Sequence, residues 1–169
     1  ISGSSVATID ENTGKVTFIK AGDVTVVAKK EADGNYLETT ATYTLKIEKS
    51  NQQPLNVTHP AEITYNPDAQ DVFSVANNNC GNGEITYSII EGSECATIDS
   101  NTGKVTTEKA GTIKVQIDKA GDDGYNAATP YVATIVINKA AQKDFAFADK
   151  DPDDVTYNDN NNKFSNVVS

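Results

Sequence analysis

The chain of 169 residues contains no arginine, methionine or tryptophan, one histidine and two cysteines. Its 24 acidic residues outnumber 14 lysines, for a net charge of −10. Such a surface repels a phosphate backbone and has no guanidinium group to bind it, so we expect no nucleic-acid partner. One histidine and two cysteines cannot form a four-ligand zinc site. An enzyme needs a base, a nucleophile or a metal held in a pocket, and a chain with one histidine offers none of these. We therefore predict that the protein is not an enzyme and has no catalytic residues.

Long apolar runs are also missing. No stretch of about 18 apolar residues occurs, which predicts no membrane insertion. No signal peptide opens the chain, so we expect any export signal to lie outside these residues. Nineteen threonines, seventeen asparagines and few helix-forming runs favour many short strands joined by polar turns.

What the sequence does contain is an internal repeat with a period of 89 residues. Residues 6–17 return almost unchanged as residues 95–106, and an ungapped comparison of 6–36 with 95–125 finds 17 of 31 positions identical. Self-similarity on this scale indicates a tandem array of one domain. We predict three segments: 1–49 as the C-terminal part of one repeat, 50–139 as a complete repeat, and 140–169 as the N-terminal part of the next.

The predicted complete repeat divides into seven or so short apolar segments that alternate with period two. Ile113, Val115 and Ile117, for example, share one face of a strand, with polar residues between them. The expected turns contain glycine, at Gly14, Gly103, Asp33-Gly34 and Asp123-Gly124. The pattern predicts an all-β fold of tandem immunoglobulin-like Greek-key β-sandwiches, with about seven strands in each repeat of roughly 90 residues.

These residues resemble the bacterial immunoglobulin-like (Big-type) repeats of large secreted and surface-anchored proteins, including many adhesins. The resemblance rests on Ala-Thr-Ile-Asp-x-Asn-Thr-Gly-Lys-Val-Thr, which begins at Ala7 and again at Ala96, on the Lys-Ala-Gly that follows, and on Ile-Thr-Tyr-Ser-Ile at 85–89. It covers essentially the whole chain. It implies a spacer, stalk or binding module outside the cell, and no catalytic residues carry over because the family has none.

The two ends of the chain are expected to be incomplete repeats, each with an exposed apolar face and unpaired strand edges. In one explanation the chain is a window on a longer array. In another, residues 140–169 of one molecule complete residues 1–49 of the next by strand addition, which would build a fibre. In a third, the two ends pack on the complete repeat.

Three groups of residues are candidate sites. Cys80 and Cys95 could form a disulfide, as is common in surface proteins, or Cys95 could be a small buried residue at the place of Val6 in the other repeat. Four carboxylates at the start of the third segment could bind calcium or could form a solvated acidic loop: Asp149, Asp151, Asp153 and Asp154. Asn56 begins a glycosylation sequon, Asn-Val-Thr.

We therefore expect an extracellular structural or spacer module, a stalk or fibre, of a repetitive cell-surface protein. The expected partners are neighbouring repeats of the same protein, copies of itself in a filament, or a surface glycan or protein ligand. Calcium is the only candidate cofactor. The alternative function is an adhesin or carbohydrate-binding immunoglobulin-like module, which an exposed row of aromatic side chains would favour.

Overall fold

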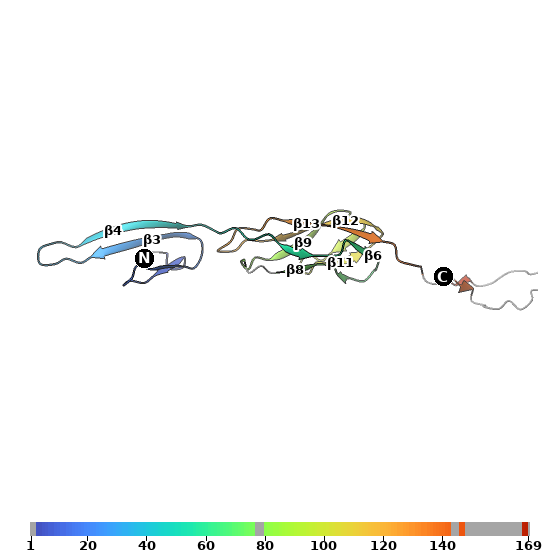
Figure 1. Cartoon of the computed structure of the whole chain (residues 1–169), viewed down its shortest axis with the longest axis horizontal. Helices are drawn as coiled ribbons and strands as arrows, with labels where there is room; N and C mark the ends of the chain where they lie inside the picture. Colours follow the sequence, from blue (N-terminus) through green and yellow to red (C-terminus); the bar gives the residue numbers. More distant parts are fainter. Residues whose placement is uncertain (1–2, 77–79, 143–145, 148–166, 169) are drawn as a thin grey trace, which may run out of the picture.

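The computed structural model describes residues 3–76, 80–142, 146–147 and 167–168, and every regular element in these ranges is a β-strand. Figure 1 shows residues 3–49, which we call the head, and residues 50–139, which we call the central unit, end to end along the long axis. A short antiparallel pair follows them, made of β14 (Ala146–Phe147) and β15 (Val167–Val168).

The head consists of two antiparallel hairpins. The short one joins β1 (Ala7–Ile9) to β2 (Val16–Phe18), and the long one joins β3 (Gly22–Lys30) to β4 (Thr39–Ile47) through nine residue pairs. Valine and threonine dominate the long hairpin, as expected for β-branched residues that fit a pleated surface. In the short hairpin, Asp10 Oδ1 accepts hydrogen bonds from the backbone N–H groups of Asn12 and Thr13, each at 2.9 Å, and closes the turn.

The central unit contains two layers of strands. One is a four-stranded sheet in the order β6-β13-β12-β9, in which only β6 and β13 run parallel; the other comprises the sheet β10-β11-β7 and the pair β5-β8. The nine strands are β5 (Asn56–Thr58), β6 (Glu62–Thr64), β7 (Gln70–Asp71), β8 (Ser74–Ala76), β9 (Ile85–Glu91), β10 (Ala96–Ile98), β11 (Lys104–Thr107), β12 (Gly111–Lys119) and β13 (Tyr131–Asn138). This confirms the predicted all-β sandwich, with nine strands where about seven were expected.

The core of the central unit is formed by side chains from both layers. Ile113, Val115 and Ile117 of β12 are fully buried, as their alternation predicts, and they share one cluster with Val105 from the opposite layer. Lys119 continues the same row at 6% exposure. Its Nζ donates to the backbone carbonyl of Cys80 at 2.9 Å, which satisfies a buried charged group.

The head buries much less of the sheet face that corresponds to the core face of the central unit. Tyr43 of β4 is 68% exposed, whereas Ala133, at the matching position of β13, is 1% exposed. Phe18 is 60% exposed, against 1% for Thr107, its counterpart 89 residues later. In the central unit, strands β5 to β9 complete the two layers. Within the described residues, no such strands complete the head.

Cys80 and Cys95 lie near opposite ends of β12 and are not bridged. Cys95 is buried beside Gly111, where a Cβ atom would lie 2.5 Å from its Sγ, whereas the Cys80 carbonyl is bound by Lys119. The nine residues of β12 span about 26 Å, and a disulfide needs Cα atoms within about 7 Å. This corrects the disulfide alternative: Cys95 is a small buried core residue instead.

A matched pair of glycines tests the packing of the two segments. Gly14 and Gly103 both have positive φ, 70° and 72°, but a Cβ at Gly103 would lie 2.8 Å from Tyr87 Cε1, while one at Gly14 meets nothing within 4 Å. Gly14→Ala should cost only the conformational strain, about 1–2 kcal/mol. Gly103→Ala should cost more, because the Tyr87 ring must also move. Hydrogen exchange of peptides from each segment measures the stability lost in each variant. Equal losses of stability in the two variants would contradict this difference in packing.

Candidate functional site at the head junction

The sequence-derived candidates do not assemble into a chemical site among the described residues. Asp149, Asp151, Asp153 and Asp154 lie outside those residues. In the described part, no three His, Cys, Asp or Glu side chains come together to hold a metal ion. Asn56 is exposed at the start of β5, and its glycosylation stays a prediction. The same part of the chain has no helix long and apolar enough to cross a membrane.

The most elaborate polar arrangement is instead the junction between the head and the central unit. The segment after β4 pairs with the loop between β12 and β13, since Ser50 N–H donates to the Gly124 carbonyl at 2.9 Å and Asn126 N–H donates to the Ser50 carbonyl at 2.8 Å. A second contact comes from the loop between β2 and β3, where Ala21 N–H donates to the Asp123 carbonyl at 3.0 Å. The linker that leaves the head after β4 and the loop of the head between β2 and β3 are therefore both tied to one loop of the central unit.

Side chains of the linker strengthen this pairing. The Gln52 amide nitrogen donates to the carbonyls of Ala120 at 2.7 Å and Asn126 at 2.9 Å, and so spans the two arms of the loop. The Asn126 amide donates to Asn51 Oδ1 at 2.9 Å. Sequence analysis overlooked Gln52, because a glutamine in a polar linker has no pattern that distinguishes it from a solvated residue.

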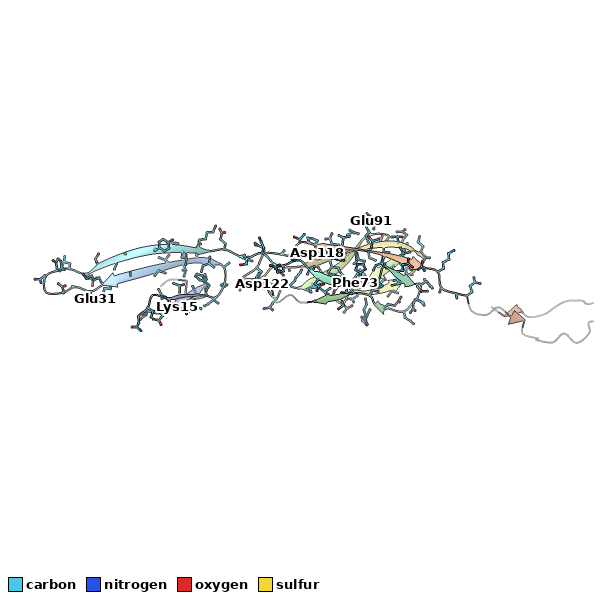
Figure 2. The ribbon with its side chains drawn as sticks, viewed as in Figure 1. Lys15, Glu31, Phe73, Glu91, Asp118 and Asp122 are labelled. Atoms are coloured by element: carbon cyan, nitrogen blue, oxygen red, sulfur yellow. The ribbon has the colours of Figure 1, made fainter. Side chains whose placement is uncertain are left out.

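Asp122 organises the same loop from inside. Its Oδ2 accepts from Asn82 N–H at 2.6 Å, and its Oδ1 accepts from the N–H groups of Gly124 at 2.8 Å and Tyr125 at 2.9 Å. These backbone donors, with Asn82 foremost, lower the pKa of the Asp122 carboxyl, and the positive charge of Lys49 adds to the effect. Figure 2 shows Asp122 at the end of the central unit that faces the head.

The head carries the same turn at its outer end. Asp33 Oδ1 accepts from the N–H groups of Asn35 at 2.8 Å and Tyr36 at 2.9 Å. The Asp33 N–H donates to the Tyr36 carbonyl at 2.9 Å, as that of Asp122 does to Tyr125 at 3.0 Å. The turns expected at Asp33-Gly34 and Asp123-Gly124 are therefore present. Their cause differs from the expectation, because neither glycine is among those with positive φ and the aspartate carboxylate closes each turn.

A shallow, open hollow of about 550 Å³ lies beside the junction. The Ile19 side chain of the head, which is 58% exposed, lines one part of it. The other lining residues belong to the central unit: Gly81, Asn82, Asp122, Asp123, Gly124 and Tyr125. None of these groups is a nucleophile or a general base with a positioned partner, and the Asp122 oxygens are already bound by backbone donors. The arrangement can hold two segments together.

Replacing Asp122 by Asn tests the role of its carboxylate. The depressed pKa means that the carboxylate stabilises the fold above its ordinary pKa of 3.8, and this contribution is lost as the pH falls through the lower folded value. Asp122→Asn should therefore lower the melting temperature most at neutral pH, and the difference from wild type should shrink below pH 3.8. Thermal melts followed by circular dichroism at a series of pH values measure this difference in melting temperature.

The matched control is Asp33→Asn, which removes the corresponding carboxylate of the head turn without touching Asn82. It should leave amide hydrogen exchange at residues 80–82 unchanged at neutral pH, whereas Asp122→Asn should speed it. If the two variants have the same effect on that segment, Asp122 does not anchor it.

Comparison with known proteins places the chain in a family. No curated protein matches the chain. Solved structures similar to it include protocadherin gamma B2 extracellular cadherin domains 3–6, with 18% identity and a TM-score of 0.38 over 72% of this chain and 33% of that one. Drosophila N-cadherin EC1-4 shows 16% identity and a TM-score of 0.37 over 80% and 40%. Human protocadherin-24 EC1-2 shows 13% identity and a TM-score of 0.37 over 83% and 80%.

The chain thus spans between a third and a half of the length of the first two of these structures. A family model for the bacterial Ig-like domain (group 2) matches residues 44–128, which is half of the chain and includes the linker, the core strand β12 and most of the loop that binds the head. The chain belongs to the bacterial Ig-like domain family, group 2.

Proposed function

We propose that this chain is a spacer segment of a tandem array of Ig-like modules in an extracellular or cell-surface protein, and that it performs no catalysis. In this proposal residues 1–49, 50–139 and 140–169 are parts of three successive repeats. The observation that carries it is the junction, where Ser50, Gln52 and Ala21 bind one loop of the central unit. Family membership and the 89-residue sequence period support the same function.

A bound linker transmits orientation, and a free linker does not. Only eight residues, 48–55, separate β4 from β5, and Ser50 and Gln52 are both hydrogen bonded to the loop between β12 and β13. The head and the central unit should therefore behave as one semi-rigid rod. The net charge of −10 keeps such rods soluble and apart from one another.

The alternative, an adhesin or carbohydrate-binding module, has less support in the central unit. There the rings of His59, Phe73 and Tyr87 pack against each other, with centroids 5.9 Å apart in each neighbouring pair. Phe73 and Tyr87 also contact the core, so these rings do not form an exposed platform. Saturable binding of the chain to a surface glycan on an array would favour the alternative.

The apolar face of the head supports a second part of the proposal, strand complementation. Phe18 and Tyr43 are exposed where the matching positions of the central unit are covered. Residues 140–169 repeat part of the sequence of the strands that complete the central unit, since 154–158 matches 62–66, which contains β6, and 164–165 matches 73–74 at the start of β8. They follow β13, whose last residues lie at the end of the central unit away from the head junction. Completion therefore requires a second molecule, and head-to-tail completion is open-ended.

Complementation predicts growth with concentration. Sedimentation of the 169-residue chain over a wide concentration range should show increasing mass, and Tyr43→Lys should prevent the increase because it places a charge on the apolar face. Thr42→Lys, on the opposite face of β4, is the control, and the mass of this variant should still increase with concentration. A monomer at every concentration contradicts complementation, and the spacer function then depends on the junction alone.

The junction is tested by Gln52→Ala. This change removes two hydrogen bonds, each contributing about 1 kcal/mol. In the wild-type chain, residual dipolar couplings from the head and the central unit should fit one alignment tensor. In the Gln52→Ala variant, the couplings from the two parts should need two different alignment tensors. Gln53→Ala, which alters the exposed neighbouring residue, should behave as wild type. Independent tensors in the wild-type chain would refute the semi-rigid spacer.

A further inference from the structure

We infer that the loop between β3 and β4, residues 31–38, is a docking surface for a second copy of this chain, which binds it through the loop between β11 and β12, residues 108–110, and through linker 140–142. The inference rests on the proposed array, and it adds which residues form the contact. Three observations carry it: an occupied example of the same surface, an exposed repetition of that surface in the head, and a repetition of its binding partners at the other end of the central unit.

The occupied example is the loop between β12 and β13. Its Asp123 carbonyl accepts from Ala21 N–H at 3.0 Å, and its Ala120 and Asn126 carbonyls accept from the Gln52 amide at 2.7 and 2.9 Å. All three acceptors are main-chain carbonyls. The surface is therefore defined by the course of the loop backbone, and a loop with the same course offers the same acceptors whatever its side chains.

The loop between β3 and β4 has that course at its turn. Asp33 makes the same two side-chain bonds and the same closing backbone bond as Asp122. At the 89-residue spacing the three acceptors correspond to the carbonyls of Glu31, Gly34 and Leu37. This loop is open to solvent, since Tyr36 is 71% and Leu37 is 91% exposed, whereas Tyr125 in the occupied loop is half-buried.

The binding partners of the occupied loop also recur. Ala110 corresponds to Ala21 within Lys-Ala-Gly, and Gln142 follows Lys139 at the spacing at which Gln52 follows Lys49. Ala110 precedes Gly111, which pairs with Ile137 near the end of β13, so both partners lie at the end of the central unit opposite the head. The two ends of the molecule are complementary, and an association of this kind is heterologous.

Charge favours the same pairing. At the observed junction Lys49 acts electrostatically on Asp122. The counterparts of these residues are Lys139 beside the linker of one copy and Asp33 in the loop of the other. Opposite charges at matching places steer two copies into this register, although both carry an overall negative charge. In the docked pair, Ala110 N–H donates to the Gly34 carbonyl and the Gln142 amide donates to the carbonyls of Glu31 and Leu37.

Cysteine cross-linking tests the contact. The background chain carries Cys80→Ser and Cys95→Val, the latter because valine occupies that place in the head, and circular dichroism verifies its fold. One chain then receives Gly34→Cys, where a Cβ meets nothing within 4 Å, and the other receives Ala110→Cys. Ala21→Cys with Asp123→Cys in one chain reproduces the observed junction, and its oxidation sets the conditions.

The control partner carries Lys15→Cys, on the exposed turn between β1 and β2. Figure 2 shows Lys15 on this turn, apart from Glu31 at the outer tip of the head. The Gly34→Cys and Ala110→Cys pair should give several-fold more mixed dimer than the Lys15→Cys and Ala110→Cys pair. Adding Gln142→Ala to the chain that carries Ala110→Cys should reduce the yield of mixed dimer. Equal yields for the two pairs overturn the inference.

A second measurement uses the unmodified chain. Amide hydrogen exchange in residues 31–37 should slow as the protein concentration rises, while exchange in residues 10–15 should not change. Concentration-independent exchange in both segments also overturns the inference. The Gln52→Ala experiment remains separate, because it tests the junction within one chain. If the wild-type chain fits one alignment tensor but docking fails, the spacer proposal remains intact. If the wild-type chain needs two tensors, the spacer proposal is refuted.

Discussion

A β-sheet with one apolar face must have that face covered, and most of this structure depends on how that requirement is met. In the central unit, β12 places Ile113, Val115 and Ile117 against residues of the opposite layer, and all three are fully buried. In the head, the equivalent face is covered only near Ala7 and Val24, and Tyr43 remains 68% exposed. Among the described residues, the same pattern of residues thus lies in a closed sandwich in the central unit and in two hairpins with an exposed face in the head.

The junction follows a different principle, because main-chain groups carry it. The contacts of Ser50 and Ala21 with the loop are backbone hydrogen bonds, and Gln52 binds two carbonyls. Such a contact depends on the shape of the loop more than on its side chains. Asp122 sets that shape by accepting three backbone N–H groups, and Asp33 accepts two in the same arrangement. An array with diverged repeats could keep the same junction if this aspartate is retained.

The sequence was a poorer guide to the polar interior. Lys119 has a charged side chain at a position where the alternation of β12 requires a buried one, and the carbonyls of Cys80 and Gly81, which accept hydrogen bonds from its Nζ, explain why it is tolerated. Cys80 and Cys95 are 15 residues apart in sequence and looked able to pair, but the long strand β12 separates them. Gly34 and Gly124 suggested glycine turns, yet Asp33, one residue before Gly34, and Asp122, two residues before Gly124, provide the closing bonds.

The sequence by itself determined the period of 89 residues, the all-β class, the inward face of β12 and the left-handed turns at Gly14 and Gly103. These follow from local alternation and local backbone preference, which do not require knowledge of distant neighbours. Tertiary structure alone decided that Gln52 binds Ala120 and Asn126, that Cys95 packs on Gly111 and that Asp122 holds Asn82. Each of these contacts joins segments that are distant along the chain, and only the closure of the sandwich and the path of the linker bring them within hydrogen-bonding distance.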